Sequence, residues 1–147
     1  MTTIRGLSFI LLVVALSPAL ALAQNQADFV GTWYSETPGT GTINGSPYEM
    51  RRELLNNRND STKTNTNRYY HGNQTVAETV GTYSWGVADG VYWTECRTVL
   101  SNGAASTCSR RNEYDIISVN PREIRYKSRT SGTTYSMLRV ADDFRLP

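Results

Sequence analysis

The sequence predicts an all-β fold: an eight-stranded antiparallel up-and-down β-barrel, preceded by an N-terminal signal peptide. Short runs rich in Val, Ile, Thr, Tyr and Trp recur after residue 23, and no window there has a convincing helical period. Gly, Asn, Asp, Ser and Pro separate these runs, as tight turns require. Strands joined in order by tight turns form a meander, and eight such strands commonly close into a barrel, which removes exposed strand edges.

Residues 1–23 have the three parts of a cleavable export signal. Arg5 supplies positive charge, Leu7 to Leu16 form an almost uninterrupted apolar run, and Pro18 ends it. Ala21-Leu22-Ala23 then gives the small-x-small pattern that a signal peptidase recognises. The apolar run is too short to span a bilayer comfortably. We therefore expect a secreted or periplasmic protein that does not span the membrane after cleavage.

The predicted mature domain, residues 24–147, has little aliphatic material. The whole chain is 39% hydrophobic, and the signal segment holds a disproportionate share of those residues. All nine tyrosines and all three tryptophans fall in the mature domain, which favours a thin, aromatic-rich core. The formal net charge of +2 argues against a nucleic-acid binder, which needs a dominant basic face.

Eight segments are predicted as strands from their composition and the turns that bound them. They cover about 29–35, 48–55, 61–70, 76–86, 91–100, 104–118, 122–129 and 133–140. The segment Glu36 to Pro47 is rich in Gly, Pro and small polar residues, and we expect a loop there. The strand at 48–55 is the least secure, because Glu53-Leu54-Leu55 would also suit a short helix.

The two cysteines, Cys96 and Cys108, are predicted to form a disulfide. Ser101-Asn102-Gly103 resembles a three-residue hairpin loop whose glycine takes the left-handed conformation. That loop would place Leu100 opposite Ala104 and, by counting outward, Cys96 opposite Cys108. Directly opposed residues of an antiparallel pair lie at bridging distance, and an exported chain meets an oxidising compartment. The bond should add about 2–3 kcal/mol at most.

The turn at Ala88-Asp89-Gly90 allows two registers. As a three-residue loop it sets Trp85 opposite Trp93, and as a two-residue Asp-Gly turn it does not. Thr130-Ser131-Gly132 marks the last hairpin.

Several segments, in order, resemble a known family. Phe29 to Tyr34 (Phe-Val-Gly-Thr-Trp-Tyr) resembles the Gly-x-Trp first strand of lipocalins and the wider calycin superfamily. Later segments resemble those of small secreted bacterial lipocalin-like domains: Gly81 to Trp85, Asp89 to Tyr92, Tyr114 to Val119 and Tyr135 to Val140. Together these segments span most of residues 29–140. The Gly31-Thr32-Trp33-Tyr34 start also resembles avidins, but the later tryptophans do not match the avidin biotin site well.

The resemblance implies structural roles for Trp33 and Arg139. In lipocalins the first-strand tryptophan packs at the closed end of the barrel, beneath an arginine near the last strand. A guanidinium can lie over an indole face while it donates to carbonyls at the barrel end. The second lipocalin motif, of Thr-Asp-Tyr type, is absent, so the resemblance does not specify the ligand.

No catalytic constellation or cofactor motif is present, so we expect no enzymatic activity. The sequence lacks a Gly-x-Ser-x-Gly elbow and a phosphate-binding loop. A metal site is not expected, since His71 is the only histidine. Three carboxylates near the cysteines are expected to form cross-strand ion pairs with three neighbouring arginines. The carboxylates are Glu95, Glu113 and Asp115, and the arginines are Arg97, Arg110 and Arg111.

A binding role fits the predicted barrel best, with a small apolar or amphipathic ligand inside. The candidate lining residues are Tyr83 and Trp85 on one strand and Tyr92 or Trp93 on the next, since neighbours in a strand face opposite ways. The same rings would also serve as an ordinary core. The alternative is a secreted protein-interaction module, such as an inhibitor or envelope accessory factor, with a filled barrel and an unspecified protein partner.

Overall fold

The computed structural model describes residues 25–147 as one short helix and nine strands; the predicted signal peptide, residues 1–23, lies outside them. The elements are α1 (Gln26–Phe29), β1 (Gly31–Ile43), β2 (Ser46–Asn57), β3 (Thr62–His71), β4 (Gln74–Ala88), β5 (Val91–Ser101), β6 (Ala104–Thr107), β7 (Arg111–Val119), β8 (Glu123–Ser128) and β9 (Thr134–Val140).

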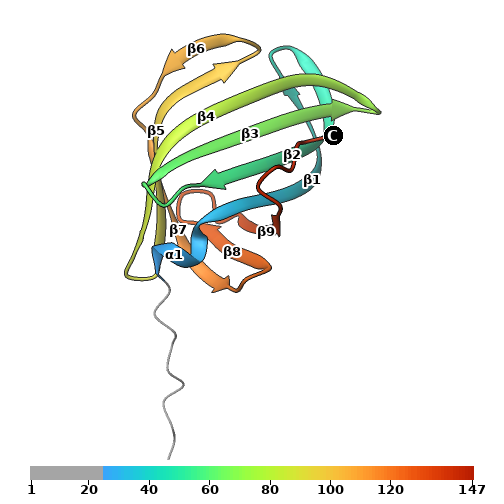
Figure 1. Cartoon of the computed structure of the whole chain (residues 1–147). Coiled ribbons are helices and arrows are strands. Elements are labelled where there is room, and N and C mark those ends of the chain that lie inside the picture. Colours follow the sequence, from blue (N-terminus) through green and yellow to red (C-terminus); the bar gives the residue numbers. More distant parts are fainter. Residues whose placement is uncertain (1–24) are drawn as a thin grey trace, which may run out of the picture.

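Antiparallel pairing closes the sheet into a barrel. The hydrogen-bonded order is β4-β3-β2-β1-β9-β8-β7-β5-β6, and a further β4–β5 pairing joins the two ends. Eight strands therefore form the wall, while β6 pairs only with β5 and extends the sheet upward (Figure 1). The closed eight-stranded barrel in up-and-down order confirms the predicted fold class.

The predicted loop at 36–47 is wrong, because the first two strands form one long hairpin. β1 continues to Ile43, and β2 begins at Ser46 after a turn at Asn44-Gly45. Both turn residues have positive φ, 51° and 80°, as a two-residue Asn-Gly hairpin turn requires. The small polar residues of this segment did not indicate a strand, because this part of the hairpin is exposed and has no apolar face. The less secure strand at 48–55 lies within β2.

The predicted strand at 104–118 is two strands, and its hairpin register is shifted by one residue. The turn has two residues, Asn102-Gly103, so Leu100 pairs with Ala105 and not with Ala104. β6 ends at Thr107, and the chain then bulges before β7 begins. The extra residue changes the register between β6 and β7, as a β-bulge does.

The disulfide forms, although its cysteines are not opposed in the predicted way. Cys96 and Cys108 are bonded across the bulge, with their Cα atoms 5.4 Å apart. The Cys96 N–H donates to the Arg110 carbonyl at 2.9 Å, and the Cys108 N–H donates to the Arg97 carbonyl at 3.1 Å. The bond therefore joins β5 to the segment that connects β6 with β7.

The turn between β4 and β5 has two residues, which settles the positions of two tryptophans. Asp89 and Gly90 have φ values of 52° and 74°. The register pairs Trp85 with Thr94 and Gly86 with Trp93. Trp85 is fully buried inside the barrel, so Trp93 lies on the outer face, against the bare backbone of Gly86.

The lower end of the barrel is filled and capped by the unpredicted helix α1. A single turn is too short to show a helical period in sequence. Phe29, at its end, is fully buried, and its carbonyl accepts hydrogen bonds from Trp33 Nε1 at 2.9 Å and Asn57 Nδ2 at 3.0 Å. The Arg139 guanidinium carbon lies 4.1 Å from the Trp33 ring centroid, and Arg139 donates to the Val30 carbonyl at 2.9 Å. The closed end is therefore tied together by backbone carbonyls and stacked rings.

The C-terminal segment folds back across the outer surface of β1 to β3. Phe144 packs on Tyr34 of β1 with ring centroids 5.1 Å apart. Leu146 is buried, and its carbonyl accepts a hydrogen bond from Arg68 of β3 at 2.6 Å. Figure 1 shows this segment in dark red, ending beside the wall.

Candidate functional site

The barrel interior has two chemically different sides. Inward positions of β2 and β3 carry polar side chains, here called the polar wall: Arg51, Glu53, Asn57, Lys63, Asn65 and Asn67. Inward positions of β5, β7, β8 and β9 carry four rings, here called the tyrosine cluster: Tyr92, Tyr114, Tyr126 and Tyr135. In an eight-stranded barrel β2 and β3 lie across the interior from β7 and β8, so the two sides face each other.

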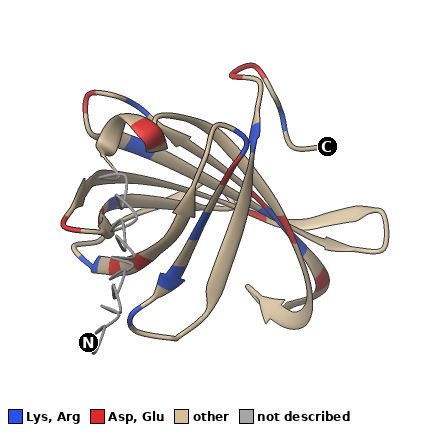
Figure 2. Cartoon of the chain, turned by 90° about the horizontal axis from the view of Figure 1, so that it is seen from below, with Lys and Arg blue, Asp and Glu red and all other residues tan. Residues whose placement is uncertain are grey.

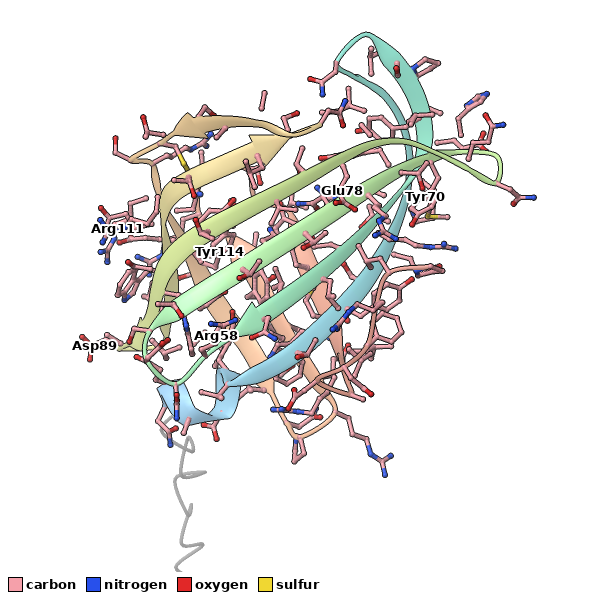
Figure 3. All side chains as sticks on the ribbon, turned by 45° about the horizontal axis from the view of Figure 1, so that its top comes forward. Arg58, Tyr70, Glu78, Asp89, Arg111 and Tyr114 are labelled. Carbon is pink, nitrogen blue, oxygen red and sulfur yellow. A yellow bond between two sulfur atoms is a disulfide. The ribbon has the colours of Figure 1, made fainter. Side chains whose placement is uncertain are left out.

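The tyrosine cluster is a continuous series of ring contacts from the upper opening to the closed end. Tyr135 stacks on Tyr126 with centroids 5.4 Å apart, and Tyr126 meets Tyr114 at 5.2 Å. Tyr114, labelled in Figure 3, meets Tyr92 at 5.6 Å, and Tyr92 stacks on Phe29 at 5.2 Å. Burial raises the pKa values of Tyr114 and Tyr126, so both remain neutral phenols near neutral pH.

On the polar wall, a carboxylate orients two amides in series. Asn65 Nδ2 donates to Glu53 Oε1 at 2.9 Å, because an ionised carboxylate only accepts. The Asn65 oxygen is then free to accept from Asn67 Nδ2 at 3.3 Å. This series leaves Asn67 Oδ1 and Glu53 Oε2 as buried acceptors without a hydrogen-bond partner among the described residues.

A buried donor lies next to these acceptors. Arg51 Nε also has no hydrogen-bond partner within residues 25–147, and Arg51 Nη2 lies 3.6 Å from Glu53 Oε2. Buried polar atoms are normally paired, because leaving one unpaired costs about 1–3 kcal/mol. A cluster of donors and acceptors facing aromatic rings is the pattern of a binding site for a small polar-edged molecule.

An entrance to this region lies where β1 and β9 separate. They pair only over Thr32–Tyr34 and Leu138–Val140, and above that level a pocket of about 440 Å³ opens between them. Arg51 of the polar wall and Tyr135 of the tyrosine cluster both line it. Its remaining rim is mainly hydroxyl-bearing: Ser35, Thr37, Thr40, Tyr48, Thr133, Thr134 and Ser136.

Lys63 is a lysine buried within the barrel. Its residue is 6% exposed, and its Nζ lies 5.3 Å from the ring centroids of both Tyr83 and Tyr92. No carboxylate lies within 4.0 Å of this amine in the part of the chain that the structure describes. Desolvation lowers the pKa of Lys63, against a smaller opposing effect of Glu53, Tyr114 and Tyr83.

This lowered pKa predicts a pH-dependent stability. The unfolded chain binds the Lys63 proton more tightly than the folded chain does, so the protonated amine lowers the free energy of unfolding at low pH. This loss of stability is relieved as the pH rises from the pKa of Lys63 in the folded protein to its pKa in the unfolded chain, about 10.4. Lys63→Met should remove this dependence. The check is urea unfolding of both proteins from pH 6 to 10, with exposed Lys127→Met as control. Parallel stability curves for wild type and Lys63→Met would contradict the expectation.

Three of the four predicted lining residues lie inside the barrel. Trp85 and Tyr92 are fully buried near the closed end, and Tyr83 is half-buried beside Lys63. Trp93 does not line the interior. Its ring lies on the outer face, with the Arg111 guanidinium carbon 4.5 Å from its centroid.

Sequence reasoning missed the polar wall and most of the tyrosine cluster. The polar wall escaped notice because polar side chains alternating along a strand normally face solvent. The available signal was that Arg51, Glu53 and Asn57 lie on the same strand face as Leu55, a leucine that is fully buried. An apolar residue on that face indicates that the face points into the barrel.

Within residues 25–147 the predicted ion pairing is mostly wrong: of the three predicted arginines only Arg111 pairs with a predicted carboxylate, along β7 and not across strands, and Arg129 is the main basic partner. Arg129 bridges Glu113 and Asp115, at 3.3 Å and 2.7 Å, and Arg111 lies 3.2 Å from Glu113. Arg97 instead donates to Ser84 at 3.0 Å. Figure 2 shows basic and acidic positions interspersed around the barrel, and residues 25–147 contain no group of three side chains suited to holding a metal ion.

No protein-family model matches this chain, and no curated protein matches it in sequence. Over residues 25–147, no helix has both the length and the apolarity needed to cross a membrane. The fold is compatible with a lipocalin-like barrel, and the disulfide favours an oxidising compartment.

Proposed function

We propose that this protein is a secreted or periplasmic, non-enzymatic binding protein of lipocalin-like type, which holds a small amphipathic ligand in the upper half of its barrel. The observation that supports this most directly is the set of buried polar atoms on Arg51, Glu53 and Asn67 that have no hydrogen-bond partner within residues 25–147 and face the tyrosine cluster across the interior. A relationship to the calycin superfamily is part of the proposal, supported by the barrel and the stacking of Arg139 on Trp33.

The two sides of the interior define the chemistry of the ligand. One face should be aromatic or otherwise flat and apolar, to pack on the tyrosine cluster. The edge of the ligand should carry a hydrogen-bond acceptor for Arg51 Nε and hydrogen-bond donors for Glu53 Oε2 and Asn67 Oδ1. The lower half of the barrel is occupied by Phe29 and Trp33, so the ligand lies above them.

A fluorescent probe tests this site directly. We expect 8-anilinonaphthalene-1-sulfonate to bind saturably, since its fused rings suit the tyrosine cluster and its sulfonate can accept from Arg51. Tyr135→Leu should weaken binding roughly 3- to 10-fold, because losing one ring contact costs about 0.5–1.5 kcal/mol. Trp93→Leu is the matched control, since it removes a ring from the outer face. Equal loss in both variants, or no saturable binding, would refute the proposed site.

Native mass spectrometry of the mature protein from its own host provides the second test. A small molecule that co-purifies with wild type and is lost in Tyr135→Leu supports the proposal. A stoichiometric protein partner, with no bound small molecule, would overturn it.

The alternative function, a protein-interaction module, is supported by one feature. β6 pairs only with β5, so its other edge has no strand partner within the described residues. Its sequence, Ala-Ala-Ser-Thr, is uncharged and exposed, and such an edge can accept a strand from another chain. A protein captured through this edge should be lost when Ala105 is replaced by proline, whereas binding of the fluorescent probe should be retained.

A further inference from the structure

The amine of Lys63 has surroundings that suit a nucleophile better than a structural ion pair. It faces the rings of Tyr83 and Tyr92 at 5.3 Å each, and the residue is more than nine-tenths buried. No carboxylate lies within ion-pair distance among residues 25–147. Desolvation by burial lowers the pKa of Lys63 and so favours the free amine, which is the reactive form.

Tyr83 lies between this amine and the upper opening. Tyr83 pairs with Lys63 across β3 and β4, while its ring folds over Gly81, one inward position nearer the opening. Gly81 leaves room for the ring because any side chain there would collide with it. Tyr83 is half-buried, whereas Lys63 and Tyr92 are buried beneath it. Rotation of one side chain would therefore expose the amine to a ligand resting on the tyrosine cluster.

We propose that Lys63 is a covalent attachment site for a small aromatic aldehyde, an inference that rests on the proposed binding function. The Nζ lone pair attacks the carbonyl carbon, and the carbinolamine then loses the carbonyl oxygen with the two amine protons as water. The product is an imine, with one C=N bond in place of C=O. The reaction consumes no oxidant or reductant and leaves an uncharged linkage in the apolar surroundings of Tyr83 and Tyr92.

The chain is well suited to a trapping experiment, because Lys63 and Lys127 are its only lysines. The mature protein is incubated with 4-hydroxybenzaldehyde and sodium cyanoborohydride. The hydride adds to the imine carbon and the nitrogen takes a proton from water, which gives a stable secondary amine. Peptide mass spectrometry should place the adduct on Lys63. Lys127→Arg should leave this labelling unchanged, Lys63→Arg should abolish it, and Tyr83→Ala should accelerate it.

The result that overturns the inference is an adduct confined to Lys127 or the α-amino group. Folding of Lys63→Arg is verified by circular dichroism and by a cooperative urea unfolding transition. To separate this inference from the proposed function, 4-hydroxybenzyl alcohol, which has the same ring but no carbonyl, is used to displace the dye. Displacement by the alcohol without labelling of Lys63 by the aldehyde would disprove covalent attachment while supporting the binding site.

Discussion

Trp85→Ala is expected to lower the free energy of unfolding by about 3–5 kcal/mol, the range for removing a large buried aromatic side chain. Trp85 is fully buried, and its ring centroid lies 6.1 Å from that of Tyr92. Its Nε1 also donates to the carbonyls of Arg58 and Thr62, at 3.1 and 2.9 Å. The substitution therefore leaves a cavity and removes a hydrogen bond that holds the β2–β3 turn. Urea unfolding followed by circular dichroism measures the change.

Trp93→Ala is the matched control, one strand away. Trp93 packs on the outer face beneath Arg111, so its removal should cost no more than about 1–2 kcal/mol, the scale of an exposed cation–π contact with some packing. The comparison also tests the turn between β4 and β5. A three-residue loop would place both tryptophans on the same face, and the two variants would then lose similar stability. Equal losses would contradict the two-residue turn at Asp89-Gly90.

Replacing both cysteines, Cys96→Ala with Cys108→Ala, is expected to lower the free energy of unfolding by about 2–3 kcal/mol. The bond closes a short loop, with a sequence separation of 12, and so restricts the unfolded chain. It also links β5 to the bulge before β7, where backbone pairing changes register. Denaturant unfolding without reductant measures the loss.

Reduction provides the control for this prediction. Dithiothreitol should destabilise the wild type to about the level of the double variant, and it should leave the double variant unchanged. Alkylation of the purified, oxidised protein without reductant should label neither Cys96 nor Cys108. Labelling of both, or a double variant as stable as the oxidised wild type, would contradict a stabilising disulfide.

Local turn chemistry explains why much of the fold is predictable from sequence. Asn44, Asp89 and Asn102 each precede a glycine, and each pair adopts positive φ in a two-residue hairpin turn. Such turns mark where strands end, but loop length is ambiguous by one residue when a small residue such as Ala88 or Ser101 precedes the pair. That single residue made the predicted register around Asn102 wrong, and it left two alternatives at Asp89. The disulfide prediction survived because the β-bulge before β7 brings the cysteines back within reach.

The candidate site was only partly predictable for a related reason. Tyr83, Trp85 and Tyr92 stood out because aromatic rings seek burial. Lys63 and Glu53 did not, because a charged residue alternating along a strand normally faces water. Here it faces the barrel interior, since Leu55, on the same face, is fully buried in the core.

The sequence by itself determined the strand-rich composition, the succession of tight turns, the barrel class and the cysteine pair. These follow from local backbone preferences and from the need to remove strand edges. Tertiary structure alone decided which face of β2 and β3 is inside, how β1 and β9 separate to form an entrance, and how four tyrosines come into contact. Those features depend on the pairing of β1 with β9, strands from opposite ends of the domain that no local signal relates. Closure places the polar wall opposite the tyrosine cluster, and that arrangement is the basis of the proposed function.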